Sequence, residues 1–264
     1  MKLDVLLSCM HQTDATLIDK SNIVGDAVVI NQCDTVGEFE YSTERGKVKF
    51  FSVTDRGLTK SRNLAIKKSN ADVCLLCDDD EVFVDDYDSK IINAYKNLPL
   101  ADVIIFKMAN RSPSFKDKVI RLKFPKTMKV SSWQISFKRE SLLKTGVRFD
   151  LFLGAGSGNG AEEELKFLLD CQRSGLKIYY VPEVIASVAQ TQSTWFKGFS
   201  EEFFENRGTT TRYILGPVIS TLYAVYYAIF KYKLYKNDIS FFKALGSTLK
   251  GIRKNKIAKQ KERT

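Results

Sequence analysis

The sequence has few of the residues that build disulfide scaffolds, thiolate metal centres or histidine-dependent active sites. Its 264 residues include five cysteines and a single histidine, His11. The cysteines are odd in number and dispersed, and Cys74 and Cys77 lie in one strand-like run, where residues three apart point to opposite faces. We therefore expect buried free thiols in a reducing compartment, and neither a zinc centre nor a hydrolase built around His11.

Glycine and proline are also scarce, and no signal peptide is apparent. The 15 glycines and 5 prolines form no repeat or low-complexity tract, which excludes fibrous and largely disordered classes. The first apolar run, residues 3–8, is too short for a signal-peptide core and leads into polar residues. With 44% hydrophobic residues the chain can form a packed core, and we expect it to be cytoplasmic.

The positive charge of the chain is concentrated near its C-terminal end. Residues 231–264 contain eleven Lys and Arg but only two acidic residues, whereas the rest of the chain is almost balanced. A basic segment of this kind favours an anionic surface as partner. The nearly neutral body argues against a nucleic-acid groove, so we expect no nucleic-acid partner.

The first half of the chain alternates between short β-rich apolar runs and helical patterns. Strands are predicted at 3–8, 26–31, 47–53, 72–77 and 101–108, and helices at 57–69 and 86–98. This order predicts an α/β fold with a mostly parallel sheet flanked by helices. Ligands of such sheets bind beyond the carboxyl ends of the strands, so the polar residues that end the runs should gather there.

The second half of the chain is less regular. We expect strands at 119–124, 131–137 and 176–181, helices at 139–145 and 161–175, and an N-cap at Asp55 for the helix at 57–69. After Gln190 the pattern is helical, with a break at Gly216-Pro217. This predicts a catalytic domain at residues 1–190 and a helical C-terminal extension at residues 191–264.

Two clusters of acidic residues are candidates for chemistry. Asp78–Asp80 follow an apolar strand, and in an extended chain Asp78 and Asp80 would point the same way toward a hard cation such as Mg²⁺ or Mn²⁺. The alternative is a solvated acidic turn that caps the next helix. Glu162–Glu164 follow the glycine-rich stretch 154–160 at a helix start, where they could accept a proton or only stabilise the helix N-terminus.

Several stretches together resemble a family 2 glycosyltransferase of the GT-A fold, of the bacterial capsular or cell-surface polysaccharide type. The resemblance covers residues 3–190. It rests on LLSCMHQ and VVINQCD at two strand ends, RGLTKSRNLAI in a helix, CLLCDDDEVFVDDY around the aspartates, and GAEEELKFLLDCQRSGLKIYYVPEV around the glutamates. No single stretch is specific, but their order and separations match the family.

The resemblance implies residue roles. It assigns the binding of Mn²⁺ or Mg²⁺ to Asp80, and catalysis to Glu163 and Glu164. The spacing from Gly175 makes Glu164 the base, whereas alignment of the preceding glycine favours Glu162 as the base. At the second strand end the family has acids where this chain has amides, although an amide can pair with a uracil edge. The implied nucleotide-sugar-binding residues are Ser8, Gln12, Asn31, Gln32, Arg62, Asp78 and Asp79.

The implied reaction is an inverting transfer of a sugar from a nucleotide sugar, with UDP favoured, to a hydroxyl of a glycan or lipid-linked acceptor. Two other functions fit the same acids. One is a metal-dependent nucleotidyl- or phosphotransferase, and the other is a catalytically silent GT-A-like scaffold at a membrane.

The C-terminal segment suggests where such an enzyme would work. Residues 213–230 carry no charge but are short for a bilayer span and contain Gly-Pro, and basic residues with interleaved aromatics follow them. This pattern favours peripheral attachment to an anionic membrane surface, at the inner face of the cell membrane. There are two alternatives: a true membrane span, and a soluble helical appendage or oligomer contact.

Overall fold

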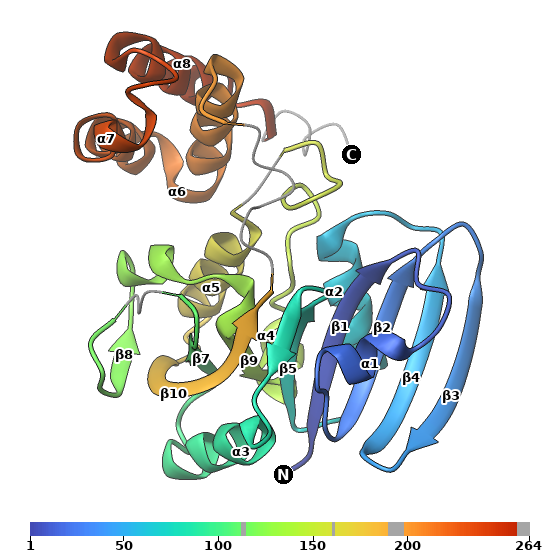
Figure 1. Ribbon diagram of the computed structural model, residues 1–264. Coiled ribbons are helices and arrows are strands. Elements are labelled where there is room, and N and C mark those ends of the chain that lie inside the picture. Colours follow the sequence, from blue (N-terminus) through green and yellow to red (C-terminus); the bar gives the residue numbers. More distant parts are fainter. Residues whose placement is uncertain (112–114, 160–161, 190–197, 258–264) are drawn as a thin grey trace. The chain divides into compact units, whose positions relative to one another are not determined.

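The chain forms two compact units (Figure 1). In this computed structural model residues 1–111, 115–159, 162–189 and 198–257 are described. The sheet unit comprises Met1–Phe149 and Glu164–Thr191, and the helical unit comprises Asp150–Glu163 and Gln192–Thr264. The expected boundary at residues 190–191, the expected helix start at 161 and the basic end at 258–264 lie outside the described residues.

The sheet unit contains a ten-stranded mixed sheet in the order β3-β4-β2-β1-β5-β9-β7-β10-β6, with β8 paired to β10. Strands β4, β2, β1 and β5 run parallel to their neighbours in this group, as the sequence predicts. Antiparallel pairing of β9 with both β5 and β7 makes the sheet mixed. The strands are β1 (Leu3–Met10), β2 (Asp26–Gln32), β3 (Gly37–Thr43), β4 (Gly46–Val53), β5 (Val73–Asp78), β6 (Glu81–Phe83), β7 (Val103–Met108), β8 (Ile120–Leu122), β9 (Ile135–Lys138) and β10 (Ile178–Val188).

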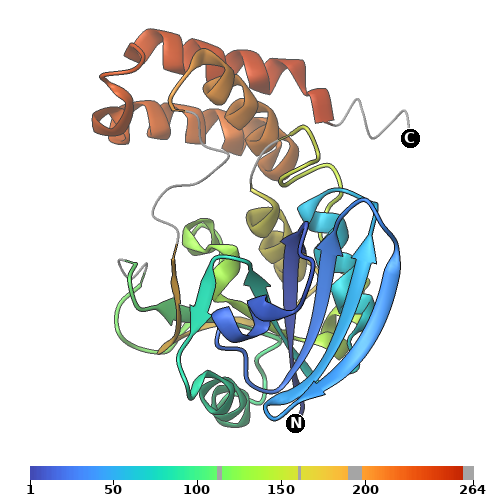
Figure 2. The ribbon, with the colours of Figure 1, turned by 45° about the vertical axis from the view of Figure 1, so that its right-hand side comes forward.

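Helices cover both faces of this sheet because its central strands are apolar on both sides. One buried cluster joins the sheet to α1 (Thr16–Lys20) and α3 (Tyr87–Asn97). A second cluster joins the other face to α2 (Leu58–Lys68), α4 (Arg139–Thr145) and α5 (Glu163–Arg173). Figure 2 shows this layering from a second side. The α/β fold class with flanking helices is confirmed.

Cys74 and Cys77 confirm the strand alternation that the sequence predicts. Cys74 belongs to the cluster under α2, α4 and α5, whereas Cys77 belongs to the cluster under α1 and α3. All five cysteines are free thiols. Burial raises the pKa of Cys74 to about 12, so this thiol is uncharged at neutral pH and packs as a small apolar side chain.

Two local predictions need correction. Helix α2 begins after Gly57 and has no side-chain cap, so the expected N-cap at Asp55 is wrong; that carboxylate instead pairs with Lys60 at 3.1 Å. Strand β3, which was not predicted, pairs antiparallel with β4 at the sheet edge. Its residues are mostly exposed, so it has no buried apolar face to stabilise it. Hydrogen bonds to β4 and the stacking of Phe39 on Phe50 hold it in place.

The described helices of the helical unit are α6 (Glu201–Phe230), α7 (Tyr232–Tyr235) and α8 (Phe241–Lys254). Helices α6 and α8 pack very closely at Gly208. A Cβ added to this glycine would lie 2.0 Å from the carbonyl oxygen of Thr248. The Glu205 carboxylate of α6 also pairs with Lys250 at 2.8 Å and with Lys254 on α8. The expected helical break is confirmed by non-helical backbone at Gly216, ahead of Pro217.

Substitution of Gly208 by alanine should destabilise the helical unit by about 1–3 kcal/mol, because the added methyl group overpacks the contact between α6 and α8. Gly246→Ala is the matched control: it lies on α8 with no atom within 4 Å of an added Cβ and should gain about 0.5–1 kcal/mol of helix propensity. Urea titration followed by circular dichroism measures both, and equal midpoints would contradict the close packing.

Candidate active site

The carboxyl ends of the parallel strands bring the predicted site residues to one edge of the sheet. The register pairs Ser8 of β1 with Asp78 of β5, and Met10 of β1 with Gln32 of β2. Side chains alternate along a strand, so Ser8 and Asp78 lie on the face that α2 and α5 cover, two residues beyond the buried Leu6 and Leu76. These acidic and hydroxyl groups therefore meet the first turns of those helices.

Arg62 of α2 is the centre of this arrangement. Its side chain is 1% exposed, and its Nη2 donates to both carboxylate oxygens of Asp78 at 3.0 and 3.2 Å. Its Nη1 lies 3.9 Å from Oε1 of Glu164, and the guanidinium lies 5.4 Å from the ring centre of Phe149. A buried guanidinium is tolerated only with such partners, so one cation joins β5, α2 and α5.

The position of Glu164 follows from the periodicity of α5. Phe167, Leu168 and Cys171 are buried against the sheet. Glu164 precedes them by three, four and seven residues, so it lies on the same side of the helix, one turn closer to its N-terminus. The side chain of Glu164 is 19% exposed to solvent. The structure thus brings Glu164 together with Asp78 through Arg62, and leaves the carboxylate accessible to solvent.

Glu162 and Glu163 have different surroundings. Glu162 precedes α5, has a left-handed backbone (φ 82°) and pairs with Arg207 of the helical unit at 3.4 Å. The guanidinium of Arg207 lies 4.4 Å from the ring centre of Tyr227 and donates to the hydroxyl of Tyr223 at 2.9 Å. Glu163 is buried. The two candidates for the catalytic base, Glu162 and Glu164, are therefore held by different arginines.

The aspartates form an acidic turn and not an extended stretch. Strand β5 ends at Asp78, and Asp79 and Asp80 turn the chain into β6, so the alternation expected for Asp78 and Asp80 does not continue. Partial burial and the charge of Asp78 raise the pKa of Asp79 and of Asp80. Crowded carboxylates of this kind favour a bound cation.

Glu81 extends the acidic turn into the protein interior. The residue is 1% exposed; its Oε1 accepts the backbone N–H of Asp78 at 3.4 Å, and its Oε2 has no hydrogen-bond partner. Burial first, and then the charge of Asp78, hold the pKa of Glu81 well above its ordinary value. The turn therefore contains more acid than the resemblance assigned to it.

The amides at the end of β2 shape the neighbouring loops. Asn31 accepts the backbone N–H of Gln12 at 2.9 Å and donates to its carbonyl oxygen at 2.8 Å. Gln32 accepts the N–H of Gly57 at 2.6 Å, which joins β2 to the start of α2. The side-chain amide of Gln12 donates to the carbonyl oxygen of Met10 at 3.0 Å. Asn31 and Gln32 thus fix the backbone at the strand edge.

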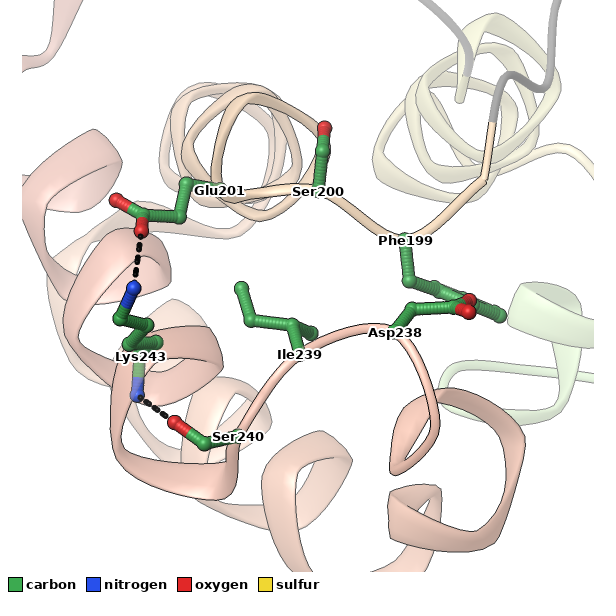
Figure 3. A pocket seen from close by; sticks show the side chains of 7 residues that line it. All are labelled: Phe199, Ser200, Glu201, Asp238, Ile239, Ser240 and Lys243. Atoms are coloured by element: carbon green, nitrogen blue, oxygen red, sulfur yellow. Dashed lines mark hydrogen bonds and ion pairs between the residues drawn. The ribbon is translucent and has the colours of Figure 1, made fainter.

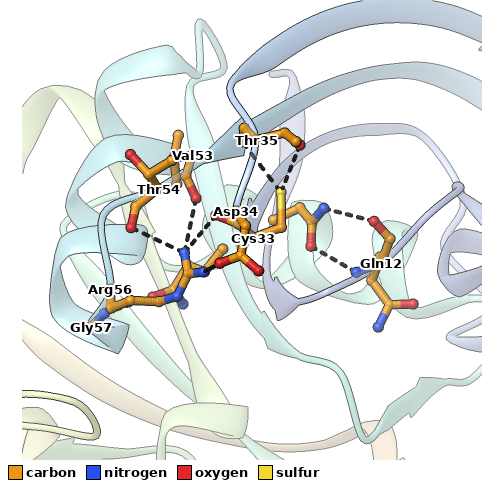
Figure 4. Close-up of polar contacts among 10 residues, drawn as sticks. Gln12, Cys33, Asp34, Thr35, Val53, Thr54, Arg56 and Gly57 are labelled. Atoms are coloured by element: carbon orange, nitrogen blue, oxygen red, sulfur yellow. Dashed lines mark hydrogen bonds and ion pairs between the residues drawn. The ribbon is translucent and has the colours of Figure 1, made fainter.

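Arg56 closes the same edge between β2 and β4. Figure 4 shows its guanidinium directed at backbone oxygens of both strand ends: it donates to Cys33 at 2.7 Å and to Thr54 at 3.0 Å. It also pairs with the exposed carboxylate of Asp34 at 2.6 Å. Because these backbone oxygens hold Arg56 in place, its side chain forms a fixed part of the surface at this edge of the sheet.

Three residues in contact with the predicted site were missed by the sequence analysis. Ser132 donates to Oδ2 of Asp78 at 3.0 Å; it comes from a short 3-10 turn before β9, an antiparallel strand that starts where β5 ends. Ser61 of α2 donates to Ser8 at 2.8 Å. Glu81 was quoted only as part of a longer motif. Single serines carry no sequence signal, since only the sheet order places them here.

A pocket in the helical unit has different chemistry (Figure 3). It is lined by Phe199, Ser200, Glu201, Asp238, Ile239, Ser240 and Lys243. The ammonium of Lys243 pairs with Glu201 at 3.3 Å, and Asp238 adds a second carboxylate. This lining has an acidic balance, so it is a poor site for a diphosphate, and we place the candidate active site at the strand edge.

The carboxylates at the strand edge would suit a hard cation that is shared between the protein and a bound phosphate. Among the residues described here, no group of three or more His, Cys, Asp and Glu is arranged to enclose a metal ion. Mg²⁺ bound with a substrate phosphate uses one or two carboxylates plus phosphate oxygens. Asp80, with its raised pKa beside Asp78 and Asp79, fits this partial type of site.

Comparisons with known proteins agree with this fold. Residues 38–152 match the family profile described as Glycosyl transferase family 2. The chain is similar to S. aureus TarS 1-349 in complex with UDP-GlcNAc, at 15% identity and a TM-score of 0.63 over 96% of this chain and 82% of that chain. It is also similar to the mannosyltransferase PcManGT from Pyrobaculum calidifontis in complex with GDP-Man and Mn²⁺, at 12% identity and a TM-score of 0.53 over 96% and 86%. No curated protein matches.

The sheet order, the flanking helices and these similarities define a GT-A-like fold. Within that fold the match to the family profile described as Glycosyl transferase family 2 is confined to residues 38–152. The matched segment contains Arg62, the acidic turn and Ser132, whereas Glu164 lies outside it.

Replacing Arg62 by methionine should lower the free energy of unfolding by about 3–5 kcal/mol, because Asp78 and Glu164 lose the buried cation that compensates their charge. Arg62→Lys should lose part of this, since one ammonium group cannot reproduce the two separate nitrogens that face Asp78 and Glu164. Lys60→Met, on the exposed side of the same helix, should change stability by less than about 1 kcal/mol. Urea unfolding tests all three, and equal losses for Arg62→Met and Lys60→Met would refute the role of Arg62.

Replacing Asp80 by asparagine should raise the thermal midpoint in EDTA at neutral pH. A carboxyl whose pKa is raised by folding destabilises the fold above that pKa, and the cost disappears as the pH falls through it; asparagine removes the cost at every pH. The assignment of Asp80 as a cation ligand further predicts that Mn²⁺ with UDP raises the thermal midpoint of the wild type and does not raise that of the variant. Asp55→Asn, at an exposed position of the same edge, should change neither midpoint, and a normal Mn²⁺ response of Asp80→Asn would contradict the assignment.

Proposed function

We propose that this protein is an inverting glycosyltransferase that moves a sugar from a UDP sugar to a hydroxyl of a glycan or lipid-linked acceptor. The observation that carries the proposal is the buried Arg62. It joins Asp78 at the end of β5 to Glu164 at the start of α5. Asp78 and Glu164 thereby lie on the same face of the sheet, which supports a donor-binding edge with a basic carboxylate beside it.

The nucleotide would bind at the strand edge formed by β1, β2, β4 and β5. This edge would be lined or shaped by Ser8, Gln12, Gln32 and Asp79. Asn31 would contribute by holding the backbone of Gln12 through two hydrogen bonds. A UDP sugar is favoured because the similar S. aureus protein was solved with UDP-GlcNAc and with UDP. The similar Pyrobaculum protein was solved with GDP-Man, and a comparison of UDP and GDP binding tests the choice of base.

Mn²⁺ or Mg²⁺ would be held at Asp80, with Asp78 and Asp79 beside it. When bound, the cation supplies positive charge that stabilises the departing diphosphate. The residues of the chain prepare the site for this group: Arg62 and Ser132 hold Asp78, and the turn at Asp79 and Asp80 keeps further carboxylates at the same edge.

Glu164 would act as the base, and Glu163 would support it as a neighbouring residue of the helix start. The Glu164 carboxylate takes the proton of the acceptor hydroxyl as that oxygen attacks the anomeric carbon. A new C–O bond forms on one face of the sugar while the bond to the phosphate oxygen breaks on the other, and UDP leaves with the electron pair. One such displacement inverts the anomeric configuration, and no covalent enzyme intermediate is needed.

A role in capsular or other surface polysaccharide synthesis extends this proposal. A lipid-linked acceptor would place the reaction at the inner face of the cell membrane. Its support comes from the sequence resemblance and from the basic, aromatic-rich segment after residue 230.

Glu164→Gln should bind the UDP sugar with unchanged affinity but lose transfer by about 10²–10⁴-fold, because a neutral amide cannot accept the proton. Glu140→Gln, an exposed glutamate of α4, is the control and should keep full activity. Isothermal titration gives binding, and product analysis by NMR with a panel of simple sugar and lipid-linked acceptors gives transfer and anomeric configuration.

The outcomes separate the competing functions. Full transfer by Glu164→Gln would move the base to another residue, and Glu162→Gln would then be the next variant. Release of pyrophosphate from a nucleoside triphosphate without sugar transfer would favour a nucleotidyltransferase. Absence of binding to any of the UDP, GDP and CMP sugars with Mn²⁺ would favour a catalytically silent scaffold.

A further inference from the structure

Helix α6 consists of two parts with different surroundings. The backbone breaks at Gly216 (φ 78°, ψ 178°), and Pro217 begins the second part. Before the break, residues 208–211, Ile214 and Leu215 are buried. After the break, Ala224, Tyr227 and Ala228 are buried, and Tyr227 belongs to the small core with Phe204, Tyr235, Ile239 and Ala244. The second part is therefore packed along one side.

The opposite side of this second part is apolar and open. Leu222 is 66% exposed and Phe230 is 70% exposed. Large apolar side chains on a soluble helix normally face a core, so a continuous exposed stripe indicates a surface for binding. We name this stripe the α6 apolar face; its residues are Val218, Ile219, Leu222, Val225, Tyr226, Ile229 and Phe230.

Basic residues lie directly beside the α6 apolar face. Lys231, Lys233 and Lys236 follow it in the chain and are exposed, together with Leu234 of α7. From Tyr213 to Ile257 the sequence contains one acidic residue, Asp238. An apolar stripe bordered by ammonium groups matches a bilayer surface with anionic headgroups, which attract the lysines while acyl chains receive the apolar side chains.

The same features argue against a membrane span. Helix α6 is the one described helix that is long and apolar enough in composition to cross a membrane. Beyond the break, however, Pro217–Phe230 is only about 21 Å long at 1.5 Å per residue, below the roughly 30 Å of bilayer hydrocarbon. The part before the break contains Arg207 paired with Glu162, and Tyr213 hydrogen-bonded to Asp150 at 2.6 Å. These polar contacts bind it to its own unit.

A second copy of the chain fits the face less well. In a symmetric pair with parallel helices, the lysines that follow Phe230 in one copy would lie near those of the other, and their like charges would repel, whereas an anionic lipid surface attracts them. An antiparallel pair separates these lysines but leaves them without the anionic partner that a lipid surface provides.

We propose that the α6 apolar face is a membrane-docking surface that lies in the interface of an anionic bilayer, with Lys231, Lys233 and Lys236 on the lipid headgroups. Phe242 of α8 is a further exposed apolar side chain of the same unit, at 83% exposure. The inference goes beyond the transfer reaction, and it places attachment in α6 and α7 and not in the lysine-rich end of the chain.

Vesicle flotation of the full chain tests this proposal. The protein should float with vesicles of phosphatidylcholine and phosphatidylglycerol and much less with phosphatidylcholine alone. Leu222→Glu/Ile229→Glu should lose at least tenfold in affinity, since both charges would enter the acyl region. Lys231→Gln/Lys233→Gln/Lys236→Gln should lose about fivefold per lysine. The matched control, Leu100→Glu/Leu143→Glu, alters exposed leucines of the sheet unit and should bind like the wild type.

Four results would overturn the proposal. The first is equal binding of the wild type to neutral and anionic vesicles, and the second is unchanged binding of the Leu222→Glu/Ile229→Glu variant. The third is retention of the wild type on the vesicles after an alkaline carbonate wash, which indicates a span. The fourth is a wild type that binds no vesicles but forms an oligomer, where the Leu222→Glu/Ile229→Glu variant is a monomer. Circular dichroism confirms folding of each variant. If the glutamate variant does not fold, the lysine variant alone decides, because its changes lie on exposed side chains.

Discussion

The buried guanidinium of Arg62 is the interaction on which the candidate active site depends. A charge that is 1% exposed must be compensated by the protein, and the compensation comes from Asp78 on β5 and Glu164 on α5. Three elements that are distant in sequence therefore have to meet at one atom group. Phe149, beneath the guanidinium, adds an aromatic contact from a fourth segment. The charge that stabilises the site also fixes its geometry.

Around this fixed cation the acidic turn is left with an excess of negative charge. Arg62 and Ser132 compensate Asp78, but Asp79, Asp80 and Glu81 all have raised pKa values from burial and mutual repulsion. A divalent cation and a diphosphate would complete the electrostatic balance that the chain alone leaves incomplete. Such binding would account for the gathering of acid at the end of a buried strand in a basic protein. The stability that the crowded carboxylates cost would then be restored by the bound groups.

The helical unit separates packing from exposure in a similar way. Gly208 and the Glu205–lysine pairs bind α6 closely to α8, while the break at Gly216 starts a second helical part with one buried and one open side. The Glu162–Arg207 pair links the residues before α5 with α6 inside the same unit. Under the proposed function both features would be used, since one would order the residues before α5 and the other would contact the membrane.

The sequence by itself determined the periodicities and the chemistry of the strand ends. Apolar runs such as residues 72–77 predict strands, the pattern of α5 places Glu164 with Phe167 and Leu168, and Gly216-Pro217 predicts the break in α6. It did not reveal β3, whose aromatic residues Phe39 and Tyr41 alternate weakly on an exposed edge, nor the contact of Ser132 with Asp78. Tertiary structure decided these, because a contact across the sheet depends on strand order and register, and no local pattern encodes a partner that lies far away in the chain.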